Sequence, residues 1–138
     1  MPENEIEIKE TKDIPLSAIL ELYKANHWSS AEKPAELYSA LLNSHSLITA
    51  WHNDKLVGLG NSLSDGYLVV YYPHLLVQPE YQGQGVGKLI LEKFQEKYAH
   101  FHQQILVADG KAIEFYEKCG FEIAGETKPM WIYKGGDH

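Results

Sequence analysis

Hydrophobic and polar positions repeat with different periods along the chain, and each period predicts a type of element. Residues 5–9 alternate between polar and apolar, which predicts an edge strand. Behind Pro15, apolar residues from Leu16 to Tyr23 recur at helical spacing, and a second such set follows Pro34. We therefore expect one strand and two helices in the first third of the chain.

Turn residues divide the middle of the chain. Two apolar runs flank Asn53-Asp54, which predicts a hairpin with a two-residue turn. Asp65-Gly66 predicts a second turn, and residues 67–77 then form a run that is mostly apolar on both faces, as in a central strand. Pro73 interrupts this run. Because proline cannot donate to a strand ladder, we expect a bulge or a break in pairing there.

The last third of the chain predicts two more helices and three short strands. These elements are a helix with an apolar stripe from Val86 to Phe101, a strand at 104–107, a helix at 112–119 ended by Gly120, and strands at 121–124 and 130–134. The complete order, βααβββαβαββ, predicts an α+β protein with a mixed sheet.

Composition limits the kind of protein. The chain has 138 residues, 44% hydrophobic and 22% charged, so residues 1–138 are expected to form one globular domain. The single cysteine, Cys119, allows no internal disulfide, and no long apolar span or secretory leader is visible. These features favour a cytoplasmic protein without a membrane segment. The net charge of −7 argues against nucleic-acid binding and favours a cationic partner molecule.

A glycine-rich segment follows the long apolar run. It reads Gln82-Gly83-Gln84-Gly85-Val86-Gly87 and opens the predicted third helix. Backbone N–H groups at such a helix start bind phosphate, and glycines allow the close approach and positive φ that this needs. The spacing fits neither a Walker loop nor a dinucleotide fingerprint. A tight turn without a ligand is the alternative interpretation.

A second segment changes this balance. Together with Gln82-x-x-Gly85-x-Gly87, the segment Ala112-Ile113-Glu114-Phe115-Tyr116-Glu117-Lys118-Cys119-Gly120-Phe121 resembles the signatures of the GCN5-related N-acetyltransferase (GNAT) superfamily. The resemblance extends to the order of elements over nearly the whole chain. It implies an acyl-CoA N-acyltransferase fold with a mostly antiparallel mixed sheet and splayed central strands, and acetyl transfer from acetyl-CoA to a primary amine. It also allows a homodimer.

The resemblance implies a set of cofactor-binding residues. Backbone N–H groups of the loop and helix start are expected to hold the diphosphate, and a backbone donor of the central strand to stabilise the thioester oxygen. The set is Leu75, Leu76, Val77, Gln82, Gly83, Gln84, Gly85, Val86, Gly87, Lys88, Asp109, Ala112, Phe115 and Tyr116. Asp109 stands where many relatives carry asparagine, so contact with CoA and helix N-capping are equally good interpretations.

Two residues are candidates for proton transfer. Tyr116 matches the family tyrosine that faces the CoA sulfur and is our general acid, with a plain core tyrosine as the competing interpretation. His74 is the candidate base because imidazole titrates near neutrality, although relatives often carry an acidic residue nearby. A water relay is an equal alternative. Alternation would place Tyr72, His74 and Leu76 on one strand face unless a bulge intervenes.

The acceptor is expected to be a small amine. By family analogy it would lie near the loop between the first two helices, with His27, Trp28 and Tyr72 as substrate-binding residues and Trp131 adding aromatic surface. A peptide N-terminus or lysine side chain stays open. Neither Cys119 as a nucleophile nor His100-x-His102 as a metal site is favoured, so no metal is expected. A non-catalytic acyl-CoA-binding domain on the same fold is the alternative function.

Overall fold

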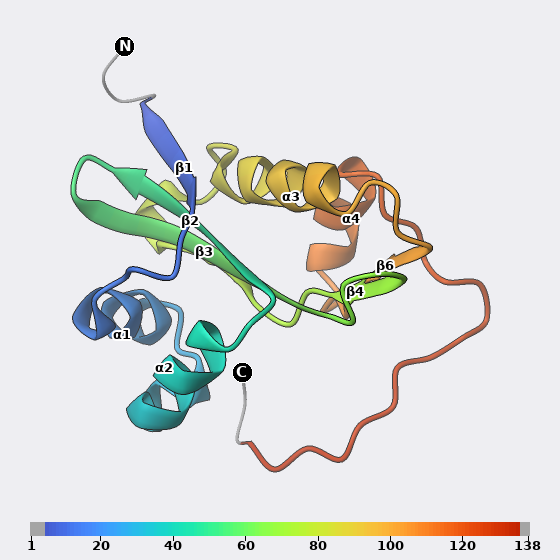
Figure 1. Ribbon diagram of the computed structural model, residues 1–138, viewed down its shortest axis with the longest axis horizontal. Coiled ribbons are helices and arrows are strands. Elements are labelled where there is room, and N and C mark those ends of the chain that lie inside the picture. Colours follow the sequence, from blue (N-terminus) through green and yellow to red (C-terminus); the bar gives the residue numbers. More distant parts are fainter. Residues whose placement is uncertain (1–4, 136–138) are drawn as a thin grey trace.

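The computed structural model describes residues 5–135, which form a mixed six-stranded sheet with helices on both faces (Figure 1). In chain order the elements are β1 Ile6–Glu10, α1 Leu16–Ala25, the 3-10 turn Ser29–Glu32, α2 Pro34–Leu42, β2 Ser46–His52, β3 Lys55–Ser64, β4 Val69–Tyr71, β5 Leu75–Val77, the 3-10 turn Pro79–Tyr81, α3 Val86–Lys97, β6 Gln103–Ile105 and α4 Ala112–Lys118. The sheet order is β1-β2-β3-β4-β6, and β5 pairs with another part of β3.

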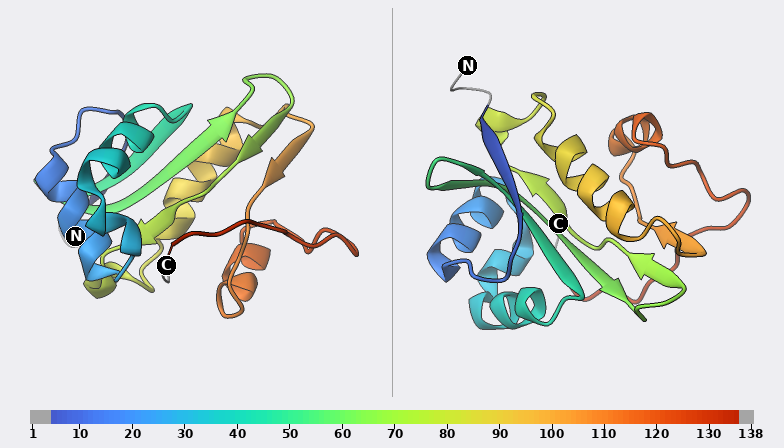
Figure 2. Two further views of the ribbon diagram at one scale, coloured as in Figure 1. Left: turned by 90° about the horizontal axis from the view of Figure 1, so that it is seen from below. Right: turned by 45° about the horizontal axis from the view of Figure 1, so that its top comes forward.

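The N-terminal half of the sheet is covered on both faces (Figure 2). α1 and α2 pack on one face around Leu59 and Leu76, and α3 packs on the other around Val57 and Phe94. β3 carries Gly60 under α3, where a Cβ would lie 2.8 Å from the Phe94 ring. The absent side chain therefore allows α3 to approach the sheet closely. The predicted edge strand and the hairpin at Asn53-Asp54 are confirmed.

The long strand predicted over residues 67–77 is two short strands. Leu63 pairs with Tyr71 and Gly60 pairs with Leu75, so two residues of β3 lie opposite three residues that include Pro73. The extra residue is the irregularity that proline predicted. It also reverses the facing of the strand, because Tyr72 lies in the core under α3 whereas Leu76 lies in the core under α1.

The bulge separates the two central strands. β4 continues the sheet by pairing in parallel with β6, and the Tyr72 N–H donates to the Ile105 carbonyl. β5 pairs with β3 alone among the described strands. Beyond Ile105, β5 and β6 therefore diverge, in agreement with the splayed strands that the resemblance implies.

The two C-terminal strands were predicted wrongly. Residues 122–135 contain no strand, and their backbone hydrogen bonds form a turn around Gly125. The polar–apolar pattern is present, but a strand requires a neighbouring strand, and this segment lies off the sheet. The strand predicted at 104–107 is observed at 103–105. Helix α4 ends at Lys118, just before Gly120, whose φ of 98° is what the predicted helix stop requires.

Candidate active site

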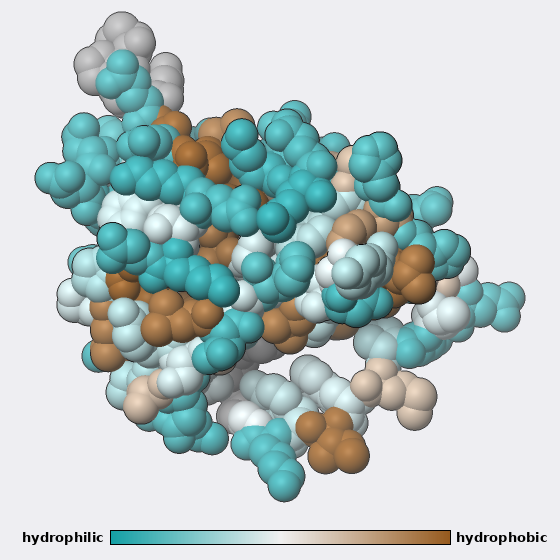
Figure 3. Space-filling view, viewed as in Figure 1, coloured by the Kyte–Doolittle hydropathy of each residue, from teal (hydrophilic) through white to brown (hydrophobic). Residues whose placement is uncertain are grey.

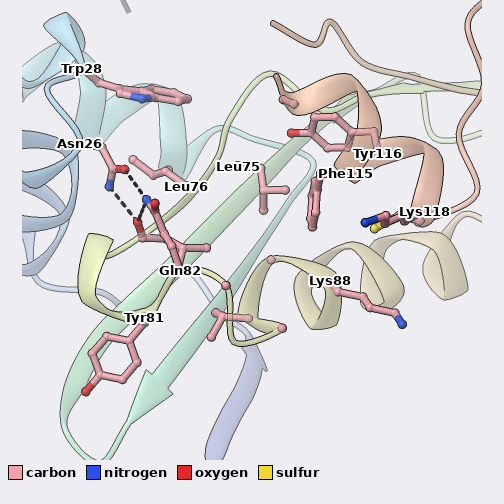
Figure 4. Close-up of a pocket in the computed structure, with 17 residues that line it drawn as sticks. Asn26, Trp28, Leu75, Leu76, Tyr81, Gln82, Lys88, Phe115, Tyr116 and Lys118 are labelled. Atoms are coloured by element: carbon pink, nitrogen blue, oxygen red, sulfur yellow. Dashed lines mark hydrogen bonds between the residues drawn. The ribbon is translucent and has the colours of Figure 1, made fainter. Parts of the chain in front are cut away.

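A cleft of about 590 Å³ opens where β5 and β6 diverge, between the loop before α3 and helix α4 (Figure 4). It is lined by twelve of the predicted cofactor residues: Leu75, Leu76, Val77, Gln82, Gly83, Gly85, Val86, Gly87, Lys88, Ala112, Phe115 and Tyr116. Trp28 lines it as well. Segments far apart in sequence thus meet at one cavity, as the family resemblance implied.

Gln84 and Asp109 are the two predicted cofactor residues outside the lining. The Gln84 side chain donates to the Glu80 carbonyl, 3.1 Å away, and so points back along its own loop. Asp109 is exposed, and its backbone carbonyl accepts from the Ala112 N–H at 2.8 Å. No side chain caps α4, so the N-capping alternative for Asp109 is wrong.

The glycine loop presents backbone donors to the cleft. Gly83 and Gly85 have φ of 78° and 88°, which side chains disfavour, and Gly85 is the residue that precedes the first turn of α3. No side chain caps this helix start. The first-turn N–H groups therefore face the cavity as a site suited to an anion.

The outer edge of β5 also faces the cleft. The Val77 carbonyl accepts from the Asn26 and Gln82 side-chain amides at 3.1 and 3.0 Å, while the next residue, Gln78, donates to Val57 of β3. Because the N–H and C=O of one strand residue point to the same side, the Val77 and Leu75 N–H groups point toward the cleft. The Gln82 amide also donates to the Asn26 side-chain oxygen, which joins the loop to the end of α1 (Figure 4).

Tyr116 points its hydroxyl into the cleft from α4 (Figure 4). Burial raises the pKa of Tyr116 to about 12, with smaller contributions from Cys119 and Asp109. Among residues 5–135 this hydroxyl has no hydrogen-bond partner, so it can donate to a bound molecule. A protonated donor at neutral pH is what the predicted general acid requires.

His74 lies behind the cleft rather than in its lining. Its Nδ1 is 2.8 Å from the hydroxyl of Tyr23, and the Trp28 ring stands edge-on to it with centroids 4.9 Å apart. Tyr23 is fully buried, and its pKa is raised by that burial. The tautomer of His74 sets which of the two groups donates in this contact.

The predicted acceptor residues lie in different environments. Trp28 borders the cleft, but His27 is exposed just after α1 and is not in the lining. Tyr72 is a correction: it is 5% exposed under α3, and its hydroxyl donates to the Gln104 side chain at 2.7 Å. It lies on the same side of the sheet as Val70, and the bulge separates it from Leu76, with which simple alternation had grouped it.

Four lining residues are absent from the predicted cofactor- and substrate-binding sets: Asn26, Tyr81, Lys118 and Cys119. The Asn26 contact with Gln82 spans 56 positions of sequence, so no local pattern could reveal it. Lys118 and Cys119 lie inside the second family segment, which was a usable signal. Burial raises the pKa of the Cys119 thiol, which keeps it protonated and a poor nucleophile.

Two further features are absent from the described part of the chain. Residues 5–135 contain no group of three or more His, Cys, Asp or Glu side chains arranged to hold a metal ion. The same residues contain no helix with the length and apolar character needed to cross a membrane.

Comparison with known proteins gives consistent matches. The family model of the acetyltransferase (GNAT) domain matches residues 11–130. The structure of SP0256, a GNAT family acetyltransferase of Streptococcus pneumoniae TIGR4, aligns with a TM-score of 0.82 at 30% identity, covering 94% of this chain and 99% of that one. Both matches span the cleft and the elements around it.

Curated relatives match to different extents. Peptidyl-lysine N-acetyltransferase YiaC of Escherichia coli K12 is 28% identical over 143 residues, 91% of this chain and 93% of YiaC. GCN5-related N-acetyltransferase 2, chloroplastic, of Arabidopsis thaliana is 39% identical over 84 residues, 57% of this chain and 32% of that protein. The chain spans about a third of the length of the plant relatives it matches. With the family model covering residues 11–130, the chain belongs to the GNAT family of acetyltransferases.

Proposed function

We propose that residues 1–138 act as one domain that transfers the acetyl group of acetyl-CoA to a primary amine by direct attack in a ternary complex. The observation that carries the proposal is the convergence of three groups on one cleft: the N–H groups that open α3, the edge of β5, and the Tyr116 hydroxyl. A cytoplasmic location suits such a protein with a single free thiol.

Binding begins at the glycine loop. The N–H groups of residues 83–88 donate hydrogen bonds to the CoA diphosphate, and the helix dipole of α3 adds attraction for its negative charge. The pantetheine arm then runs between the edge of β5 and the side chains of Phe115 and Ala112. This path brings the thioester to Leu75, Val77 and Tyr116.

The chemical step forms one bond and breaks another. The neutral amine attacks the thioester carbon, the C–N bond forms, and the carbon–sulfur bond then breaks to release CoA as a thiolate. A backbone N–H of Val77 or Leu75 stabilises the oxygen as it gains charge. The attacking nitrogen becomes positively charged and loses a proton to solvent, which leaves the amide, while Tyr116 donates its proton to the leaving sulfur and regains one from solvent.

The incoming ammonium must first lose a proton. His74 was the candidate base, but it lies outside the lining of the cleft, and its Nδ1 is engaged with the Tyr23 hydroxyl at 2.8 Å. A water relay along the cleft is therefore favoured for this proton. His74 and Trp28 then serve to shape the end of the cleft where the acceptor binds.

The acceptor that we favour is a small amine. Trp28 offers it an aromatic wall, and the net charge of −7 suits a cation. A lysine side chain of a protein is the second candidate, because YiaC, which matches 91% of this chain, is a peptidyl-lysine N-acetyltransferase. Parallel assays with small amines and with lysine peptides separate the two.

Calorimetric titration with acetyl-CoA tests the binding step. The wild-type protein is expected to bind, and Gly85→Glu to lose binding, because the substitution places a side chain at positive φ and a negative charge at the anion site. Absence of binding by the wild-type protein would contradict the proposal.

Thiol release with Tyr116→Phe tests the chemistry. We expect acetyl-CoA binding to be retained and turnover to fall about 10²-fold or more, as for loss of a general acid. Binding of acetyl-CoA with no thiol release for any amine would favour the alternative of a non-catalytic acyl-CoA-binding domain.

A further inference from the structure

The end of the β2–β3 hairpin lies beside the segment that leads into the glycine loop. Its two-residue turn, Asn53-Asp54, sets His52 directly opposite Lys55, so these two side chains lie on the same side of the sheet. That side faces the 3-10 turn Pro79–Tyr81, which immediately precedes the loop of residues 82–87. In Figure 3 the hairpin end is at the left edge of the molecule, where the side chains are mostly hydrophilic. The hairpin end is therefore placed to hold the start of the loop through polar contacts.

Two side chains of the hairpin contact the 3-10 turn. His52 Nδ1 is 2.7 Å from the hydroxyl of Tyr81, and the two rings stand edge to face with their centroids 5.6 Å apart. The Lys55 ammonium lies 3.0 Å from Glu80 Oε1 and 5.7 Å from the centre of the Tyr81 ring. The Lys55–Glu80 pair is exposed, so water weakens it, whereas His52 and Tyr81 are both half-buried. The contact between His52 and Tyr81 is therefore the stronger tie.

The middle of the glycine loop lacks side chains that could hold it from within. Among the described residues, no atom beyond the neighbouring residues lies within 4 Å of where a Cβ at Gly83 or Gly85 would be. The Gln84 side chain points back to the Glu80 carbonyl. The loop is therefore held at its two ends, by α3 on one side and by residues 79–82 on the other.

Tyr81 connects the hairpin to the loop. Its N–H donates to the Gln78 carbonyl at 2.8 Å. The N–H of the next residue, Gln82, donates to the Pro79 carbonyl at 3.2 Å, which closes the turn. Tyr81 also borders the cleft, while its ring points away from Tyr116 (Figure 4). A shift of the Tyr81 hydroxyl would therefore displace the first residues of the loop.

We propose that His52 is a positioning residue of the cofactor site: its contact with the Tyr81 hydroxyl fixes the start of the glycine loop. The loop N–H groups are then already ordered when the CoA diphosphate arrives, so binding costs less conformational entropy. The identity of the ligand rests on the proposed function, whereas the order of the free loop does not. His52 lies outside the lining of the cleft, so it acts through Tyr81 rather than by contact with the cofactor.

Calorimetric titration and steady-state kinetics with acetyl-CoA test the role of His52. His52→Ala is expected to raise the Kd and the KM for acetyl-CoA about three- to tenfold, with kcat and the KM for the amine unchanged, because the groups at the thioester stay in place. Tyr81→Phe should have the same effect, and the double variant should add little to either. His52→Asn, which keeps a polar group able to meet the hydroxyl, should recover part of the affinity.

His45 provides the matched control. Its Nδ1 is also 2.7 Å from a tyrosine hydroxyl, that of Tyr98, but neither residue lines the cleft. His45→Ala should leave the Kd for acetyl-CoA unchanged. Amide hydrogen exchange of the free protein gives a second readout: His52→Ala should accelerate exchange at Tyr81 and Gln82, and His45→Ala should not.

The outcomes separate this inference from the proposed function. A wild-type chain that binds no acetyl-CoA would overturn both. Wild-type binding with an unchanged Kd in His52→Ala, or an equal loss in His45→Ala, would overturn the role of His52 alone. So would unchanged exchange at residues 81 and 82 in His52→Ala, because the loop would then be ordered without this contact.

Discussion

The two halves of the sheet differ in how they are covered. β1, β2, β3 and β5 are enclosed by α1 and α2 on one face and by α3 on the other, and Leu59 and Val57 at their centre are fully buried. β4 and β6 have α3 on one face only. The apolar side chains on their other face, which we call the open face, remain in contact with solvent: Leu63, Val69, Tyr71 and Ile105.

The difference reflects where the covering segments lie in the sequence. α1 and α2 immediately precede β2, so the chain covers that half of the sheet by short connections. The segment that follows the last helix, residues 122–135, contains no strand and lies off the sheet, so the open face stays exposed. The cleft lies at the boundary, where β5 diverges from β6.

A pair of truncations tests this comparison with the largest expected effect. Leu59→Ala removes a side chain that is fully buried between α1 and the sheet, and we expect it to lower the free energy of unfolding by about 2–5 kcal/mol. Ile105→Ala on the open face should change it by about 0.5 kcal/mol or less, since this side chain is 40% exposed. Urea denaturation measures both, and equal losses would refute the comparison.

The hydroxyl of Tyr98 tests the covered face under α3. It lies 2.7 Å from both Ser62 Oγ and His45 Nδ1 and 3.1 Å from Ser46 Oγ, and Tyr98 is 1% exposed. Tyr98→Phe should lower the free energy of unfolding by about 1–3 kcal/mol, because buried polar partners lose a hydrogen bond.

Tyr67→Phe is the control for Tyr98, since this tyrosine is 83% exposed in the turn before β4. No loss of stability is expected from it. A thermal melt of the two variants side by side suffices, and an unchanged Tyr98→Phe would show that the hydroxyl network contributes nothing.

Asn26 tests the boundary between the halves. Its amide donates to the carbonyls of Leu22 and Val77, and its oxygen accepts from Gln82. Asn26→Ala should weaken acetyl-CoA binding about three- to tenfold, roughly 1 kcal/mol, because the loop loses its tie to α1.

Asn43 provides a matched control for Asn26. It ends α2 as Asn26 ends α1, and its amide donates to the carbonyl of Ser39 in the same way, but it lies outside the cleft. Asn43→Ala should leave acetyl-CoA binding unchanged in the same calorimetric titration. If both variants weakened binding equally, the effect would come from helix stability and not from the loop.

Asp65, in the turn that leads into β4, is expected to have the smallest effect on stability. Its carboxylate accepts from the N–H groups of Leu68, Tyr67 and Val69, which lower its pKa below the ordinary 3.8. A pKa lowered by folding adds stability above the unfolded value and loses it as pH falls through the folded value.

Asp65→Asn should therefore be slightly less stable than the wild type at pH 7, and the difference should shrink below about pH 3.8. Thermal melts at several pH values measure this. A difference that stayed constant down to pH 2.5 would show that the charge plays no part.

Local signals predicted most of the fold. Pro34 and Gly120 placed helix ends, Asn53-Asp54 placed a hairpin, and Pro73 located the bulge, since each acts on backbone within a few residues. The strands at 121–124 and 130–134 failed because their pattern describes side chains, whereas a strand also needs a partner.

The same distinction applies to the residues of the cleft. The glycine loop and the segment around Tyr116 were readable because each motif is contiguous. The contact of Tyr23 with His74 and the position of Tyr72 in the core depend on packing between distant segments and on the bulge, so no local pattern contains them.

The extra residue opposite β3 also sets a rule for insertions and deletions. Removing any one residue from 72–74 would leave two residues opposite two of β3, so that regular pairing could run from β4 into β5 with Leu75 and Val77 still on the α3 side. The interruption that separates β5 from β6 beside the cleft would then be lost. The turn at 65–68 carries no such constraint, because it leads into β4 from an exposed loop. Homologous chains should therefore vary in length before β4 and keep the count between β4 and β5.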